Sequence, residues 1–165
     1  MYVTRNTIPR KNISDVFKQY ICGKNRKDFV KQKIFKVGVL RKNIFMVIPL
    51  LSNREVYIST LALMHIYERR GVVLEGIVLP YFNTIIRFPD GVYLNKEGKN
   101  RRGQILFTKK IEGHYLAAIF EMAAIQGKTS CQIITIFICN HNYFESLKCL
   151  WNGRTATPSS QCNNS

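Results

Sequence analysis

Acidic residues are scarce in this chain. Its 165 residues hold 10 Asp and Glu against 25 Lys and Arg, which gives a formal net charge of +15. The acids never cluster, and the sequence has no DxD, HExxH or paired-carboxylate pattern of the kind that metal-dependent hydrolases use. It also lacks a GxxxxGK[ST] phosphate loop and a GxSxG nucleophile turn. These absences argue against a metal-dependent enzyme, a P-loop NTPase and a serine hydrolase, and we expect no metal and no cofactor.

Cysteine pairs and long apolar runs are missing as well. The five cysteines include no CxxC pair and no His/Cys spacing suited to zinc, which favours a reducing compartment. Residues 1–20 have no apolar core of a signal peptide, and the longest apolar runs, near residues 131–139, are too short to cross a bilayer. We therefore expect no membrane insertion and a cytoplasmic site of action, in the protein's own cell or in one to which it is delivered.

The positive charge is concentrated in two segments. Residues 1–42 hold twelve Lys and Arg against two acids, and residues 95–110 hold six against one. Such an excess indicates a polyanionic partner, with nucleic acid, an acidic protein and an anionic membrane surface as the alternatives. A solvated tail and loop would also account for it. The candidate RNA-binding residues are Arg41, Lys42, Lys96, Lys99, Arg101 and Arg102.

Four segments predict helices. The first, residues 12–23, has Ser14 as a possible N-cap and Gly23 as a possible end. The second runs from Ser59 as N-cap to Gly71 as the C-terminal stop. The third starts near Pro80, and the fourth covers residues 142–152. In the second helix the spacing places one group on an apolar face, Leu63, Met64, Ile66 and Tyr67. It places another group on the polar arc, His65, Glu68 and Arg69.

Alternating and β-rich runs predict the strands. Residues 33–40 and 43–51 suggest a hairpin, followed by a strand at 54–59. A turn at Pro89-Asp90-Gly91 and a polar loop over residues 92–103 come next. Three further strands with tight turns between them follow, at 104–111, 114–124 and 131–139. The pattern predicts an α+β fold, in which N-terminal helices precede a twisted antiparallel meander and helices pack on one face.

Three parts of the chain are expected. We expect residues 1–45 to form a basic N-terminal extension, residues 46–151 the main domain, and residues 152–165 a small, polar and disordered tail.

The remaining chemistry consists of histidine, cations and a hydroxyl. Such a set can cleave RNA, because the 2′-hydroxyl is an internal nucleophile and the protein supplies an acid or base together with cations for the phosphorane. The candidate catalytic residues are His65, Arg69, Lys109, Lys110 and Thr135. Lys109 and Lys110 are consecutive, so only one of them points to a given face of a strand. A structural helix histidine, two lysines protecting an edge strand and a β-favouring threonine are the alternative readings of these residues.

Two further histidines and four aromatic residues each allow two interpretations. His114 and His141 flank predicted elements and can be exposed loop histidines. Four aromatic residues can stack on bases or pack in the core, namely Tyr57, Tyr67, Tyr93 and Phe107.

The motif order resembles a known superfamily. A helix with His65 is followed by "FPDGVY", "ILFTKK", "YLAAIF" and "IITIFICNHNYFESLKCLW". Over residues 55–151 this order is similar to the barnase–EndoU–colicin–RelE superfamily of metal-independent ribonucleases, and most similar to its branch in mobile elements and polymorphic toxins. The matching positions are His65, Pro89-Asp90, Lys109 or Lys110, Thr135 with Phe137, and Leu150-Trp151. The family's Thr-Ala step is Thr135-Ile136 here.

The resemblance implies an endoribonuclease of the toxin kind, which cuts tRNA or other RNA and leaves a 2′,3′-cyclic phosphate and a 5′-hydroxyl. It also implies an acidic immunity or antitoxin protein as a partner. A non-catalytic nucleic-acid-binding accessory protein of a mobile element is the alternative, and a protein-interaction subunit is a third.

Overall fold

A seven-stranded sheet organises the chain in the computed structural model, which describes residues 8, 10–24, 32–95 and 104–153. The spatial order of the strands is β1-β2-β6-β5-β4-β3-β7, and the pair β2–β6 is parallel while the other neighbours are antiparallel. The predicted α+β fold is confirmed. The strands are β1 (Ile34–Val39), β2 (Glu55–Ser59), β3 (Gly91–Asn95), β4 (Gln104–Ile111), β5 (His114–Ile125), β6 (Lys128–Cys139) and β7 (Lys148–Asn152).

The meander β4–β5–β6 follows the sequence prediction. Two-residue turns join its long strands, at Glu112-Gly113 and at Gln126-Gly127. All four turn residues have positive φ (51° and 81°, then 50° and 76°). This conformation matches the right-handed twist of the flanking strands, and glycine adopts it without a steric cost.

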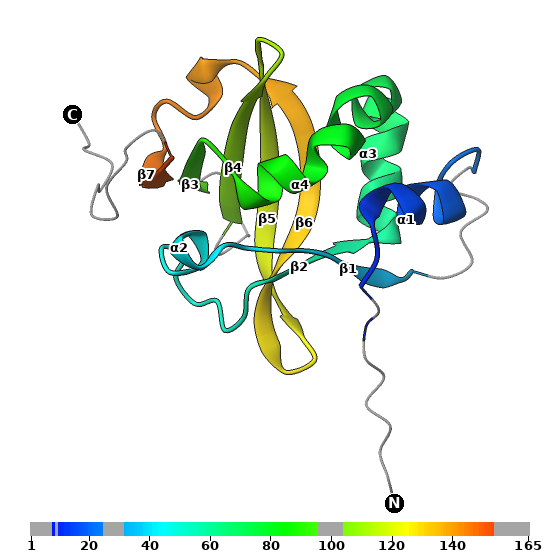
Figure 1. Ribbon diagram of the computed structural model, residues 1–165, viewed down its shortest axis with the longest axis horizontal. Coiled ribbons are helices and arrows are strands. Elements are labelled where there is room, and N and C mark those ends of the chain that lie inside the picture. Colours follow the sequence, from blue (N-terminus) through cyan, green and yellow to red (C-terminus); the bar gives the residue numbers. More distant parts are fainter. Residues whose placement is uncertain (1–7, 9, 25–31, 96–103, 154–165) are drawn as a thin grey trace, which may run out of the picture.

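Helices cover one face of this sheet. They are α1 (Ile13–Tyr20), α2 (Lys42–Phe45), α3 (Thr60–Val73) and α4 (Leu79–Arg87), with a π-helical segment, Leu74–Val78, joining the last two. Figure 1 shows α4 lying in front of strands β5 and β6, with α1 and α3 beside it. Helices α1, α3 and α4 share one hydrophobic cluster with the strands, as the sequence predicted for helices packed on one face.

Helix α3 starts where the sequence predicted and ends later. The Ser59 side chain accepts a hydrogen bond from the Ala62 amide (3.0 Å), so Ser59 is the N-cap. Gly71 does not end the helix, and that prediction was wrong. The backbone kinks at Arg70 instead (φ −147°, ψ 41°), and the helix then continues to Val73. The packing of buried Leu74 and Val78 beyond the kink favours the longer helix.

Two further expectations near the N-terminus are corrected. Asn12, not Ser14, is the N-cap of α1, because its side chain accepts from the Ser14 amide (2.8 Å). Residues 43–51 form no strand and no hairpin with residues 33–40. They contain the short helix α2, and buried Ile44 and Ile48 are four residues apart, which is a helical spacing. Strand β1 pairs with β2 instead.

Two expectations near the C-terminus are also corrected. The start of the predicted polar loop, Val92 to Asn95, belongs to β3, which pairs with β4 and β7. The predicted helix over residues 142–152 is a 3-10 turn at His141–Tyr143 followed by strand β7. Strand β7 completes the hydrogen bonding of β3, and Trp151 then packs against the main cluster. Sheet pairing thus outweighs the local helix pattern.

The two faces of the sheet bury different clusters. The helix face carries the main cluster, which includes Phe107, Phe120 and Ile136. The opposite face, here called the second face, carries a small cluster of Leu106, Ala117, Ile119 and Phe144. Phe144 comes from the segment between β6 and β7, so this segment covers part of the second face.

The range expected as an N-terminal extension contributes to this architecture. Helix α1 buries Ile13, Val16 and Phe17 in the main cluster. Strand β1, which precedes the predicted boundary at residue 45, pairs with β2, which follows it. Where residues 1–45 are described, they share one core with the rest of the chain.

No helix within the described ranges is long and apolar enough to cross a membrane.

Candidate functional site

Strand alternation places Thr135 on the second face. Its register partner on β5 is Ile119, a member of the small cluster. A bulge between Ile119 and Phe120 inserts Ile134 as an extra residue on β6. The Oγ1 atom of Thr135 is buried and has no hydrogen-bond partner among the described residues. An unpaired buried hydroxyl costs about 1–3 kcal/mol, so a neighbouring acceptor would be favourable there.

His65 lines a hollow on the part of the second face that is nearer the Gln126-Gly127 turn. This hollow, here called the His65 hollow, encloses about 440 Å³ between the start of α3 and strands β5 and β6. Glu121 and Gln132 are register partners on those strands, and both alternate with residues of the main cluster. They therefore point to the second face. The hollow is lined by Gln32, Ser59, Leu61, Ala62, His65, Glu121, Gln132, Ile133 and Ile134.

His65 is thus neither a core residue nor a freely exposed one. It is half-buried, while its neighbours Met64 and Ile66 are fully buried in the main cluster. Helix geometry forces this separation, because consecutive residues point about 100° apart around the axis. The His65 side chain is therefore partly covered by protein and lines the polar hollow with the rest of its surface.

A short polar network borders the hollow on β1 and β2. The Tyr57 hydroxyl donates to Glu55 Oε2 (2.6 Å), and Lys36 Nζ lies 2.6 Å from Glu55 Oε1. Burial disfavours the charged Glu55, but the hydrogen bonds from Lys36 and Tyr57 outweigh it and hold its pKa below the usual value. Burial and the Glu55 carboxylate raise the pKa of Tyr57 far above its usual range. The phenol therefore stays protonated, and Glu55 stays charged near neutral pH.

Arg70, and not Arg69, contacts the sheet. The Arg69 side chain is exposed. The guanidinium carbon of Arg70 lies 5.3 Å from the centre of the Phe137 ring, which belongs to the second face. The kink at Arg70 changes the direction of this residue relative to an ideal helix. Sequence spacing assumes ideal helix geometry, so it selected the neighbouring arginine.

Lys109 and Lys110 lie at the opposite end of the sheet and are both tied to Asp90. Lys109 Nζ forms an ion pair with Asp90 Oδ1 (3.1 Å), and the Lys110 amide donates to Asp90 Oδ2 (2.8 Å). The two lysines point to opposite faces, as predicted for consecutive strand residues. Lys110 belongs to the second face, since its side chain lies over Tyr115 (5.7 Å).

The five candidate catalytic residues are therefore not gathered at one point. Cys139 lies four residues beyond Thr135 on β6 and pairs with Tyr115 on β5. Tyr115 in turn pairs with Lys110 on β4, so Lys110 lies two strands away from β6. Strand geometry puts roughly 16 Å between Thr135 and Lys110. Lys109 lies on the other face, and Arg69 is exposed on α3. His65, Glu121 and Gln132 line one hollow, while Thr135 and the contact of Arg70 with Phe137 lie further along β6 on the same face.

The candidate RNA-binding residues divide into three groups. Arg41 has a structural role, because its guanidinium carbon lies 4.5 Å from the centre of the Phe88 ring and 5.9 Å from that of Trp151. Lys42 is exposed at the start of α2. The other four lie outside the described residues, namely Lys96, Lys99, Arg101 and Arg102.

The aromatic candidates for base stacking divide as well. Tyr57 and Phe107 are buried and cannot offer a ring face to a base. Tyr67 packs edge-on against Phe17 in the helix layer (5.3 Å). Tyr93 lies on the second face, 5.2 Å from Phe144. Because Tyr93 is only half-buried, it remains a candidate for base stacking.

Sequence reasoning missed Glu121, Gln132 and Arg70. Glu121 is a charged residue inside the apolar run "YLAAIFEMAA", and that interruption was a usable signal. Gln132 similarly follows Cys131 at the start of an apolar strand. The contact of Arg70 depends on the helix kink, for which the sequence carries no marker.

Nucleophilic or metal-binding cysteine is not part of this site. Burial raises the pKa of the Cys139 thiol, on the second face, to about 11, so the reactive thiolate is rare at neutral pH. Within the described ranges, no three His, Cys, Asp or Glu side chains come together as a possible metal site.

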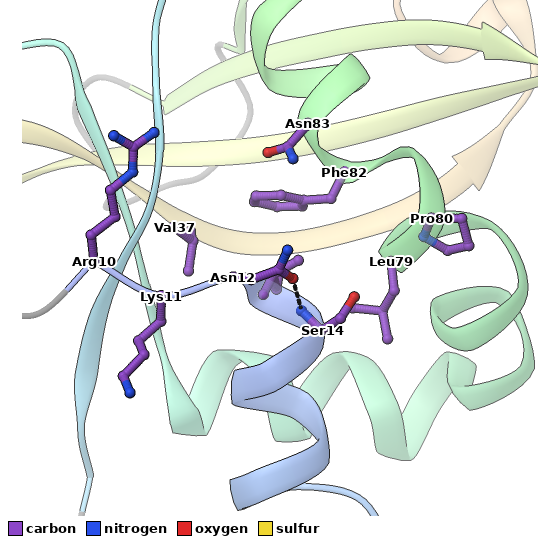
Figure 2. Close-up of a pocket in the computed structure, with 10 residues that line it drawn as sticks. Arg10, Lys11, Asn12, Ser14, Val37, Leu79, Pro80, Phe82 and Asn83 are labelled. Carbon is purple, nitrogen blue, oxygen red and sulfur yellow. Dashed lines mark hydrogen bonds between the residues drawn. The ribbon is translucent and has the colours of Figure 1, made fainter.

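A separate hollow of about 430 Å³ lies on the helix side, between the starts of α1 and α4. Arg10, Lys11, Asn12, Ser14 and Asn83 are among its lining residues. Figure 2 shows the Arg10 and Lys11 side chains pointing in opposite directions, and the Asn12 oxygen bonded to the Ser14 amide. The two cations do not converge on one point, so this hollow is a weaker candidate for an anion site than the second face.

Comparison of the chain with protein-family models, with curated proteins and with solved structures found no match.

Proposed function

We propose that this chain is a metal-independent endoribonuclease whose reaction centre is the His65 hollow on the second face. The observation that carries the proposal is the meeting of His65 from α3 with Glu121 and Gln132 from the sheet in one hollow of about 440 Å³. An imidazole and a carboxylate form a complementary acid–base pair, and an amide side chain can bind a phosphate oxygen. The resemblance of the sequence to metal-independent ribonucleases supports the same activity.

The reaction needs two proton transfers. One group removes the proton of the 2′-hydroxyl as its oxygen attacks the adjacent phosphorus, and the other gives a proton to the departing 5′-oxygen. His65 and Glu121 fill these two roles in the proposal. The P–O5′ bond breaks, and the products are a 2′,3′-cyclic phosphate and a 5′-hydroxyl. No water molecule or redox partner enters this step.

The additional negative charge of the phosphorane requires a cation. Arg70 is the proposed source, because its guanidinium reaches the second face over Phe137, two residues beyond Thr135 on β6. The original candidates Lys109 and Lys110 serve a different role here. Lys110 lies on the second face, roughly 16 Å from Thr135, which fits a contact to the RNA backbone further along the face rather than to the reacting phosphate. Lys109 lies on the other face, paired with Asp90.

The site of action of such an enzyme is the cytoplasm, where tRNA and other RNA are available. A ribonuclease that harms its own cell requires a neutralising partner. An acidic protein would complement the net charge of +15 and cover the second face.

The second candidate is a nucleic-acid-binding protein without catalysis. One observation favours it: Lys109 is paired with Asp90 and both lysines are remote from Thr135, so Arg70 is the one candidate catalytic cation whose contact lies near Thr135. Such a protein would bind RNA on the second face and leave it intact.

Digestion in EDTA separates the two candidates. Purified protein incubated with total RNA and an excess of EDTA is expected to produce fragments with 2′,3′-cyclic phosphate and 5′-hydroxyl ends. A DNA copy of a cleaved RNA is the control, because DNA lacks the 2′-hydroxyl and must stay intact. Binding of RNA without any cleavage would reject the enzyme and support the second candidate.

Replacement of Thr135 by valine tests whether its buried hydroxyl, which has no hydrogen-bond partner among the described residues, takes part in cleavage. Valine has nearly the same shape, so the variant is expected to be as stable as the native protein or up to about 1 kcal/mol more stable, since an unpaired buried polar group is removed. If the hydroxyl holds the phosphate, the cleavage rate falls about tenfold or more while the melting temperature does not drop. An unchanged rate would leave Thr135 with a structural role alone.

A further inference from the structure

A second hollow on the second face collects aromatic rings at the end opposite His65. It encloses about 130 Å³ and is here called the aromatic pocket. Its lining residues are Asp90, Tyr93, Thr108, Tyr115, His141, Phe144 and Asn152. His141 is exposed, as the sequence allowed, and it lies beside this pocket.

The rings of the pocket form a connected cluster. Phe144 lies 5.2 Å from Tyr93, 5.3 Å from Tyr115 and 5.0 Å from His141, measured between ring centres. Phe144 itself is buried, so it supports the other three rings from below. Tyr93 and Tyr115 are half-buried and His141 is exposed. The cluster thus offers partly accessible ring faces on a rigid base.

Gly91 fixes one wall of the pocket. The Tyr93 ring lies so close to the Gly91 backbone that a Cβ atom at residue 91 would come within 2.6 Å of it. Any other residue at this position would displace the ring. The glycine of "FPDGVY" therefore serves the placement of Tyr93 and not only the turn.

The polar groups of the pocket select against phosphate. Asp90 brings a carboxylate to its rim, which repels an anion. Each carboxylate oxygen already accepts one hydrogen bond, from Lys109 Nζ and from the Lys110 amide. A carboxylate has about four acceptor positions, so capacity for further donors remains. The exposed Lys110 ammonium over Tyr115 lies just outside, where a phosphate would be attracted.

We propose that the aromatic pocket binds a nucleobase that carries an exocyclic amino group, and that Lys110 contacts the phosphate attached to that nucleotide. Aromatic rings stack on any base, whereas a carboxylate prefers a base edge with an amino donor. Adenine, cytosine and guanine have this donor. Uracil has no exocyclic amino group, and the single N3–H donor of its pairing edge lies between two carbonyl oxygens that the carboxylate would repel. The predicted preference is therefore against uracil.

This inference rests on the proposed function, since it supplies the base-binding subsite of the same RNA-binding face. Tyr115 pairs with Cys139, which is four residues beyond Thr135 on β6. Strand geometry puts roughly 14 Å between Tyr115 and Thr135. Phe137 and Tyr143, which pack edge-on at 5.1 Å, lie between these positions on the face. A single RNA strand can follow this path from the aromatic pocket to the His65 hollow.

The test uses 2′-O-methyl oligonucleotides, which cannot be cleaved because the 2′-oxygen is blocked. Labelled hexamers of cytidine and of uridine are titrated with the full chain, and the dissociation constants are compared by fluorescence anisotropy. The native protein is expected to bind the cytidine hexamer about tenfold more tightly than the uridine hexamer. Asp90→Asn, which can both donate and accept, is expected to remove this preference.

Two ring variants complete the test. Tyr115→Ala and His141→Ala are each expected to weaken binding of the cytidine hexamer by about tenfold, because a stacking surface is lost. Tyr81→Ala is the matched control, since Tyr81 lies on α4 and hydrogen-bonds Glu112 on the other side of the sheet. His141 is exposed, so its variant keeps the test valid if Tyr115→Ala fails to fold.

Equal affinities of the native protein for the two hexamers would overturn the inference. Unchanged binding by both ring variants would overturn it as well. Failure of the proposed function gives a different result. In that case the hexamer preference and its loss in the variants are seen, yet unmodified RNA stays intact in the presence of native protein.

Discussion

Replacement of His65 by alanine is expected to reduce RNA cleavage by about 10²- to 10⁴-fold, the usual contribution of a positioned general acid or base. His65 is half-buried at the wall of the His65 hollow, and its immediate neighbours hold the helix in place by burial in the core. The substitution removes the imidazole without opening the main cluster. Initial rates on a short RNA in EDTA, with the melting temperature as a check on folding, measure the effect.

The chain provides a matched histidine control. His114 is exposed at the start of β5, next to the Glu112-Gly113 turn. His114→Ala removes the same chemical group from a position far from the hollow, so it is expected to cleave RNA at the native rate. A His65→Ala protein that folds and still cleaves within threefold of the native rate would remove His65 from the reaction centre.

Replacement of Phe120 by alanine is expected to destabilise the protein by about 3–5 kcal/mol. The Phe120 ring is fully buried in the main cluster on β5, and its centre lies 4.6 Å from that of Phe107 on β4. Alanine leaves a cavity in the middle of the sheet, where two neighbouring strands and the helix layer cannot collapse around it. Domains of this size have total stabilities of about 5–15 kcal/mol, so the loss is a large fraction of the whole.

Urea unfolding followed by circular dichroism measures this loss. Phe88→Ala is the control, because Phe88 is 49% exposed and contacts Arg41 at the surface. Its expected cost is below about 1 kcal/mol. Equal losses in the free energy of unfolding for the two variants would contradict the position of Phe120 in the core between the sheet and the helices.

The core of the meander was predictable because its signals are local. The turn residues Glu112-Gly113 and Gln126-Gly127 fix the two long hairpins through their backbone conformation. The alternation of "ILFTKK" and "YLAAIF" fixes which residues share a face. Ser59 marks the start of α3 through its own side-chain hydrogen bond. Each of these features depends on residues close together in the chain.

The errors occurred where distant segments compete. Residues 43–51 and 142–152 have patterns that suit both helix and strand, and the pairing of β1 with β2 and of β7 with β3 decided between them. The parallel pair β2–β6 brings together segments more than 70 residues apart. Local propensity is weaker than the hydrogen bonding and burial gained from such partners.

The candidate site shows the same division. By itself the sequence determined the residue types available: few acids, three histidines and many cations. Tertiary structure alone decided which of them meet. It brought Glu121 and Gln132 beside His65, replaced Arg69 by Arg70 at a helix kink, and held Lys109 at Asp90 on the other face. The reason is physical: a side chain's chemistry is fixed by its covalent structure, but its neighbours are fixed by the packing of segments that are far apart in sequence.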